Sequence, residues 1–184
     1  GLWVLVFFYC WFEFCGMSLS VNKWVSIFAV ALTLVAVRAD SGLPSVGESP
    51  PDFALASSTG VNLRLSEYRG EIVLLNFWAS SCRSCRAELL QLNSIVATTA
   101  SGVRVLSVNI DDNRAKVEQD LRALKLGFPV MFDTEQAVSK LYDLPTLPVT
   151  LFIDQLGRLR FVHQGYKAGD EKVYKDELAN LLAE

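Results

Sequence analysis

The chain has 184 residues, of which 51% are hydrophobic and 20% are charged, and its formal net charge is −3. This length predicts one domain with a small addition, and the composition excludes a disordered or low-complexity chain. The slightly acidic balance argues against nucleic-acid binding, which requires a basic surface. The four cysteines are too few for a disulfide scaffold, and the single histidine makes a zinc or Ser-His-Asp site hard to build. We therefore expect neither a metal nor a cofactor.

Residues 1–39 form a hydrophobic leader that carries only three charged residues. Its longer apolar run, residues 24–37, is flanked by basic residues and has a length typical of a signal peptide. The signal is well formed if translation begins at Met17, and cleavage would then follow Ala39. The alternatives are an uncleaved membrane anchor and a buried helix of the domain. With a signal or an anchor the rest of the chain is exported, either to the periplasm or membrane-anchored on the extracytoplasmic side, where disulfide chemistry is possible.

Residues 40–51 are rich in proline, glycine and serine and predict a linker, so that the main domain spans residues 52–184. Apolar periodicity and turn signals predict the following elements: a hairpin at 53–65 turning at Thr59-Gly60, a buried strand at 71–79, a helix at 82–98, a strand at 103–109, a helix at 114–126 stopped by Gly127, a strand at 128–132, a helix at 135–142, strands at 149–154 and 159–164, and a closing helix at 170–183.

The closing helix is expected to turn four apolar side chains inward, namely Val173, Leu178, Leu181 and Leu182. Alternation of strands and helices predicts an α/β fold with a mostly parallel central sheet covered on both faces. The late pair of strands adds antiparallel edges to this sheet. Because such a fold hosts many chemistries, the function has to be inferred from a site.

Cys82 and Cys85 stand where a buried strand is predicted to become a helix. Three positions along a first helical turn bring two sulfur atoms within disulfide range. The positive end of the helix dipole, with the cations of Arg83 and Arg86, favours the thiolate of Cys82. This arrangement predicts a redox pair in which Cys82 attacks a substrate disulfide and Cys85 resolves the mixed disulfide. The alternatives are an inert disulfide and half of a zinc site, although the domain has no other cysteine to complete one.

Three segments together resemble exported thioredoxin-like proteins of the TlpA/ResA type. They are LSEYRGEIVLLNFWA at residues 65–79, CRSCRAE at 82–88 and TLPVTLFID at 146–154, and the resemblance extends over about residues 44–184. It implies a thioredoxin fold with an extra βα unit, which residues 128–142 would supply. It also implies periplasmic or membrane-facing disulfide exchange, often in cytochrome c maturation.

The same resemblance suggests roles for further residues. Pro148 would be a cis-proline that places Leu147 beside the cysteines, with backbone groups free to pair with a substrate strand; an ordinary trans proline is the alternative. Trp78 is expected in the core beside the site, and it joins Leu147 and Pro148 as a candidate for substrate binding. Glu88 shares a helix face with Cys85 and would be a partly buried acid that manages its proton. The alternative is a solvated glutamate paired with an arginine.

Two positions depart from this family's pattern. Ser81 stands where the family commonly has tryptophan, and Ser84 stands where it commonly has proline. A hydroxyl at Ser84 can donate to sulfur, so we expect it to stabilise the Cys82 thiolate and make the couple more oxidising than a proline version. These departures affect the substrate and the direction of exchange, not the chemistry itself.

The leading hypothesis is an exported thiol–disulfide oxidoreductase, more specifically a monomeric disulfide reductase. Its partners would be protein thiols or disulfides and a membrane electron donor or thiol reductant. One alternative is a peroxiredoxin-like peroxidase, although residues 77–81 lack the proline and threonine that its signature requires. The other is a thioredoxin-like copper-binding or delivery protein, in which His163 would join the two thiolates as a third ligand.

Overall fold

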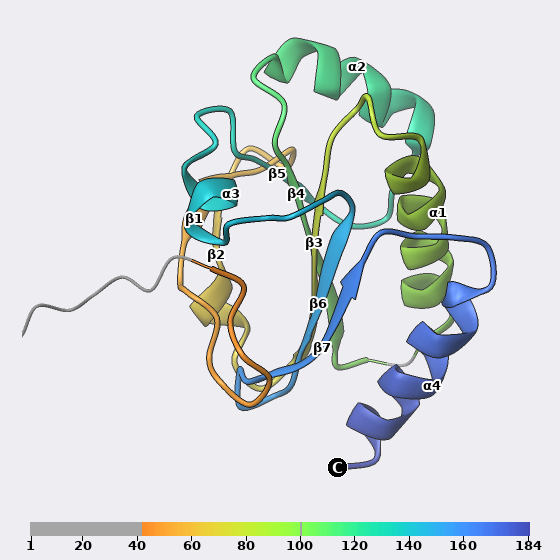
Figure 1. Cartoon of the computed structure of the whole chain (residues 1–184). Helices are drawn as coiled ribbons and strands as arrows, with labels where there is room; N and C mark the ends of the chain where they lie inside the picture. The colour runs from red at the N-terminus through yellow and green to blue at the C-terminus, as the bar shows by residue number, and fades with distance from the viewer. Residues whose placement is uncertain (1–41, 100) are drawn as a thin grey trace, which may run out of the picture. The chain divides into compact units, whose positions relative to one another are not determined.

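A five-stranded mixed sheet organises the computed structural model, which describes residues 42–99 and 101–184 (Figure 1). The order of strands across the sheet is β5-β4-β3-β6-β7. The strands are β3 (Ile72–Trp78), β4 (Val103–Asn109), β5 (Val130–Phe132), β6 (Val149–Ile153) and β7 (Leu159–Gln164). β3, β4 and β5 run parallel to one another, whereas β6 is antiparallel to both β3 and β7. The predicted α/β fold class is confirmed.

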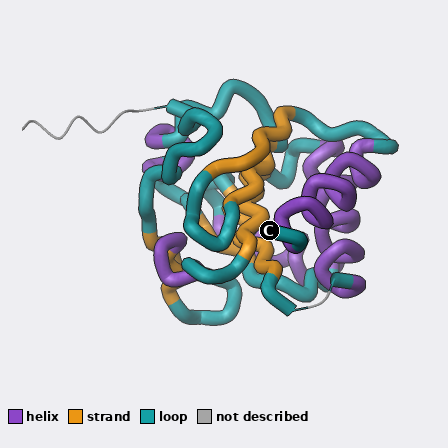
Figure 2. Tube along the Cα trace, turned by 90° about the horizontal axis from the view of Figure 1, so that it is seen from below, coloured by secondary structure: helices purple, strands orange, loops and turns teal. Residues whose placement is uncertain are grey.

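Two groups of helices cover the two faces of the sheet. Every residue of β3 is buried, as expected for a central strand that is apolar on both faces. One face packs against α1 (Arg83–Thr98), α2 (Arg114–Leu124) and α4 (Asp170–Leu182). The other packs against α3 (Ala137–Leu141), the 3-10 helix η1 (Leu65–Tyr68) and the hairpin of β1 (Ala54–Ala56) and β2 (Asn62–Arg64). Figure 2 shows the longer helices gathered on one side of the strands. The hairpin and the extra βα unit of β5 and α3 were both predicted.

The predicted end of α2 is wrong by two residues. The helix stops at Leu124 because Lys125 adopts a left-handed conformation, with φ 49°, and donates its N–H to Leu121. Gly127 lies beyond the helix and donates its N–H to Asn93 Oδ1 of α1 at 2.7 Å. Lys125 therefore caps α2, and Gly127 instead joins the loop after α2 to α1.

The buried face of α4 also differs from the prediction. Tyr174, Leu178 and Leu181 are buried, whereas Val173 is 46% and Leu182 is 43% exposed, so the inward placement of these last two residues is wrong. The buried positions are spaced by four and three residues, which is the period of one helix face. That face is turned by one position so that the hydroxyl of Tyr174 reaches the interior of the domain.

The predicted leader, residues 1–39, lies outside the described residues. The predicted linker is described from residue 42 onward, and it makes backbone hydrogen bonds to the domain: Gly47 donates to Leu159 at 2.7 Å, and Leu159 donates to Glu48 at 2.8 Å. This segment therefore covers the beginning of edge strand β7. None of the helices in residues 42–99 and 101–184 is both long and apolar enough to cross a membrane.

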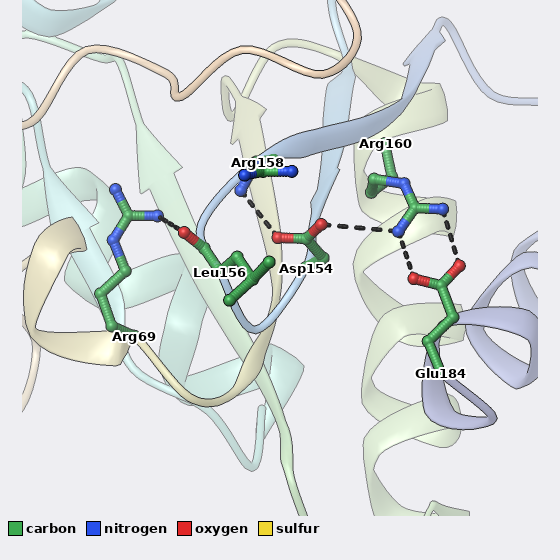
Figure 3. A network of polar contacts seen from close by, with 6 residues as sticks. All are labelled: Arg69, Asp154, Leu156, Arg158, Arg160 and Glu184. Carbon is green, nitrogen blue, oxygen red and sulfur yellow. Dashed lines mark hydrogen bonds and ion pairs between the residues drawn. The ribbon is translucent and has the colours of Figure 1, made fainter.

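A polar network fastens the end of the sheet that lies away from the cysteines (Figure 3). Arg69 donates to the carbonyl oxygen of Leu156 at 2.7 Å in the turn between β6 and β7. Arg160 of β7 lies 3.5 Å from a carboxylate oxygen of Asp154, and it binds both carboxylate oxygens of Glu184 at 2.5 and 2.7 Å. The network thereby ties the residues that follow α4 to the sheet and holds that helix against it.

Candidate active site

Cys82 and Cys85 form a disulfide at the junction of β3 and α1, with their Cα atoms 5.3 Å apart. Cys82 is the residue that caps the helix, and its sulfur accepts the backbone N–H of Cys85 at 3.2 Å. Cys82 is partly exposed, whereas Cys85 is completely buried. One sulfur is thus accessible from solvent, and the other lies beneath it.

The surroundings of Cys82 favour negative charge on its sulfur. The first turn of α1 contains no acidic residue, and Arg83 and Arg86 are both exposed there. The hydroxyl oxygen of Ser84 lies 3.5 Å from the sulfur of Cys82. Unpaired N–H groups and the helix dipole act in the same direction. This position can therefore stabilise the thiolate that forms when the disulfide is reduced.

Glu88 is completely buried one turn after Cys85 on the same helix. Its Oε2 accepts a hydrogen bond from Asn76 Nδ2 at 2.8 Å, and its Oε1 accepts from Thr150 Oγ1 at 2.8 Å and from the Tyr174 hydroxyl at 2.5 Å. Burial raises the pKa of Glu88 to about 6, and the three hydrogen bonds limit this rise. The alternative of a solvated glutamate paired with an arginine is wrong.

A row of polar side chains crosses the sheet beneath this acid. Ser107, Asn76, Thr150 and His163 are successive register partners on β4, β3, β6 and β7. Ser107 Oγ lies 3.5 Å from Asn76 Oδ1, which orients the amide group of Asn76 toward the acid. No role is predicted from the sequence for Asn76, Thr150 or Tyr174. The signal that could have revealed Asn76 and Thr150 was a single polar residue in each of the apolar strands β3 and β6, which lie side by side in the sheet.

The loop before β6 lies at the same end of the sheet as the cysteines, because the register of β6 on β3 brings its start level with the end of β3. The Leu147–Pro148 peptide bond is cis, as predicted. Leu147 is half-buried and packs against both cores, and the carbonyl of Pro148 accepts the N–H of Gly165 at 2.7 Å. Trp78 is 2% exposed and lies in the core with Cys85, so its contact with substrate stays a prediction.

His163 of β7 contacts two side chains of α4. Its Nε2 lies 2.6 Å from a carboxylate oxygen of Glu177, and its ring packs against that of Tyr174 at a centroid distance of 4.5 Å. Within residues 42–99 and 101–184, no three His, Cys, Asp or Glu side chains are grouped so that they could hold a metal ion. The structure therefore does not bring His163 together with the two cysteines, as the copper-binding alternative requires.

Comparison with known proteins gives a consistent family. Residues 46–162 match the model of the AhpC/TSA family. The thiol-disulfide oxidoreductase ResA of Geobacillus kaustophilus is 34% identical over 122 residues, which cover 66% of this chain and 70% of the relative. ResA of Bacillus subtilis is 31% identical over 137 residues, which cover 73% of this chain and 76% of the relative.

Solved structures agree with this assignment. A protein from Chlorobium tepidum described as a thiol:disulfide interchange protein DsbE has a TM-score of 0.70 and 29% identity, over 75% of this chain and 98% of its own. An exposed lipoprotein thioredoxin of Streptococcus pneumoniae has a TM-score of 0.60 and 28% identity, over 70% of this chain and 99% of its own. The chain therefore belongs to the AhpC/TSA family within the thioredoxin superfamily, as a thiol–disulfide oxidoreductase of the ResA type.

Proposed function

We propose that this oxidoreductase reduces disulfide bonds of exported proteins, with Cys82 as the attacking thiolate and Cys85 as the resolving thiol. The observation that carries the proposal is the asymmetry of the pair. Cys82 is partly exposed at the positive end of α1, whereas Cys85 is completely buried. Only Cys82 is therefore accessible to a protein disulfide, and Cys85 can react only after Cys82 has done so.

The proposed reaction has two exchange steps. The Cys82 thiolate attacks one sulfur of the substrate disulfide, forms a mixed disulfide and releases the other substrate sulfur as a thiolate. Cys85 then attacks Cys82 Sγ and releases the second substrate thiol. The substrate gains two electrons, and the Cys82–Cys85 disulfide seen in the structure is the product. A thiol reductant or a membrane electron donor must return two electrons before the next cycle.

Glu88 is the proposed acceptor of the Cys85 proton. Both residues are completely buried and are separated by three positions on one helix, which places them on the same face. A base acts best when its pKa lies near the working pH, and burial raises the pKa of Glu88 to about 6. Glu88 would then be mostly ionised at neutral pH and basic enough to take the proton.

The substrate is proposed to lie along the loop before β6. Leu147 there is only half-buried and precedes a strand, so its backbone can pair with an extended substrate segment. The resemblance to the TlpA/ResA type favours cytochrome c maturation as the process and an extracytoplasmic location. A likeness to an exposed lipoprotein thioredoxin supports that location. Mass spectrometry of the expressed chain tests it: cleavage after Ala39 or recovery in membranes supports export, and an intact leader in the soluble cytoplasmic fraction contradicts it.

The test of the chemistry uses the full chain with Cys10→Ser and Cys15→Ser, which leaves only the two cysteines of the site. The reduced chain reacts with the disulfide reagent dithionitrobenzoate, and each exchange releases one coloured thiolate. We expect two thiolates per chain, one from the Cys85→Ser variant, and loss of the fast first phase in Cys82→Ser. Loss of the fast first phase in Cys85→Ser, or an unchanged fast phase in Cys82→Ser, would overturn the assignment.

The direction of exchange is tested by the reduction potential. A value near that of thioredoxin, roughly −270 mV, supports a reductase, and a value toward roughly −120 mV contradicts it in favour of an oxidant.

A further inference from the structure

The carboxylate of Glu88 is held unequally at its two oxygens. Oε1 accepts two hydrogen bonds, from Thr150 Oγ1 at 2.8 Å and from the Tyr174 hydroxyl at 2.5 Å. Oε2 accepts one, from Asn76 Nδ2 at 2.8 Å. Each carboxylate oxygen has two lone pairs, so Oε1 is filled and Oε2 retains one free position.

We propose that Tyr174 is a positioning residue of the active site, which fills Oε1 of Glu88 and so directs the proton released by Cys85 to Oε2. This inference rests on the proposed function, in which Cys85 gives its proton to Glu88. As Cys85 Sγ attacks Cys82 Sγ, the S–H bond of Cys85 breaks and an O–H bond forms at Oε2. Oε1 then becomes the carbonyl oxygen of the acid and still accepts from Thr150 and Tyr174.

The ring of Tyr174 is held in the orientation that this role requires. It is 1% exposed and packs against three aromatic rings, with centroid distances of 5.3 Å to Phe152, 4.5 Å to His163 and 6.2 Å to Tyr166. His163 is fixed in turn by its contact with Glu177 on α4. The hydroxyl therefore cannot turn away from the acid without a rearrangement of this cluster.

Other ionisable groups near the acid have different partners. Asp170, at the start of α4, adds to the effect of burial in raising the pKa of Glu88. Tyr166 donates to Glu171 at 3.2 Å, and His163 and Glu177 pair with each other on the outer side of the Tyr174 ring.

Beneath the acid, the groups on β3 and β6 that contact it are the uncharged Asn76 and Thr150. On α1, the thiol of Cys85 becomes the neighbouring ionisable group once the disulfide is reduced. Tyr174→Phe thus removes one donor to Oε1 and leaves the charges around Glu88 unchanged.

The experiment measures the second phase of thiolate release, which reports attack by Cys85, between pH 5 and pH 9 in the background without Cys10 and Cys15. We expect Tyr174→Phe to move the acid limb of this profile upward by roughly one pH unit or more, because a donor to the charged form is lost. Tyr142→Phe is the matched control: Tyr142 is also completely buried, and its hydroxyl donates to the carbonyl of Pro51 at 2.7 Å on the other face of the sheet. Its profile should coincide with that of the unsubstituted protein. The inference is overturned if the Tyr174→Phe profile coincides with that of the unsubstituted protein, or if Tyr142→Phe shows an equal shift.

A second measurement does not depend on the folding of a variant. In the ¹³C-labelled reduced chain, the side-chain carboxyl carbon of Glu88 and the Cζ carbon of Tyr174 should titrate with one common midpoint. A Tyr174 resonance that does not change during the titration of Glu88 refutes the hydrogen-bonded role. Absence of a second thiolate from the unsubstituted protein refutes the proposed function itself, whereas two thiolates with coincident pH profiles refute only the role of Tyr174.

Discussion

Replacement of Glu88 by glutamine should change how the stability of the fold depends on pH. Burial raises the pKa of Glu88 in the folded chain from 4.5 to about 6, whereas in the unfolded chain the carboxyl group is in water. Between these values the folded state binds the proton more tightly than the unfolded state does. The stabilising contribution of protonated Glu88 is therefore fully present below about pH 4.5 and is lost as the pH rises through about 6.

The expected size follows from the difference between the two pKa values. The two pKa values of Glu88 differ by about 1.5, and at about 1.36 kcal/mol for each tenfold change in proton affinity this difference corresponds to roughly 2 kcal/mol. Glutamine does not ionise, so the variant lacks this loss. The amide nitrogen of the glutamine is a donor and would face the donor Nδ2 of Asn76. This mismatch lowers the stability of the variant by an amount that does not depend on pH. Relative to the unsubstituted protein, the free energy of unfolding of Glu88→Gln should therefore increase by about 2 kcal/mol between pH 4 and pH 7.5.

Urea unfolding of the oxidised full chain, followed by circular dichroism from pH 4 to pH 7.5, measures this difference. Keeping the Cys82–Cys85 disulfide closed prevents the thiols of the site from titrating. Glu118→Gln is the control, because that carboxylate is 43% exposed and pairs with Arg114 on the surface of α2; its curve should stay parallel to that of the unsubstituted protein. If the Glu88→Gln difference is the same at pH 4 and pH 7.5, the argument from burial is refuted.

Ser84→Pro should lower the reduction potential by roughly 10–30 mV, because it removes a hydroxyl group 3.5 Å from Cys82 Sγ that is worth about 0.5–1.5 kcal/mol to the thiolate. Equilibration with dithiothreitol measures the potential. Ser84→Ala is the control that separates loss of the hydroxyl from the effect of the proline ring. An equal or higher potential in Ser84→Pro contradicts the expectation. Gly157→Ala should lower the free energy of unfolding by about 1–3 kcal/mol, because φ is +74° there and a Cβ atom would displace the guanidinium of Arg69 from the turn. Urea unfolding measures this loss, and an unchanged midpoint would contradict it.

The strands of the central sheet were predictable from local sequence alone. β4 and β7 have the predicted bounds, and β3 differs from its prediction by one residue at each end. A short apolar stretch between turn signals has the length of a strand and is too short for a typical buried helix, and the turn residues set its ends. The end of α2 was not predictable in this way, because the contact of Gly127 with Asn93 joins residues 34 positions apart.

The candidate site likewise has one part that local sequence predicts and one part that it does not. The disulfide pair lies within one helical turn, so spacing and position in the fold were enough to identify it. The three donors to Glu88 lie 12, 62 and 86 positions from it in the chain, on β3, β6 and α4. Asn76 and Thr150 become neighbours only through strand register, and Tyr174 becomes one only through the rotation of α4. Such a cluster follows from tertiary packing, which local patterns do not encode.

Their role as donors to Glu88 explains why the polar residues Asn76 and Thr150 stand inside the otherwise apolar strands β3 and β6. A carboxyl group buried without partners would stay protonated at neutral pH and could not accept a proton from Cys85. A buried cation beside it would hold it ionised but make it too weak a base. Three uncharged donors hold the pKa of Glu88 at about 6, between these extremes. The proposed proton transfer therefore depends on hydrogen bonds that reach Glu88 from two strands and from the last helix, and a change in any one of them should appear first in the pH profile of the site.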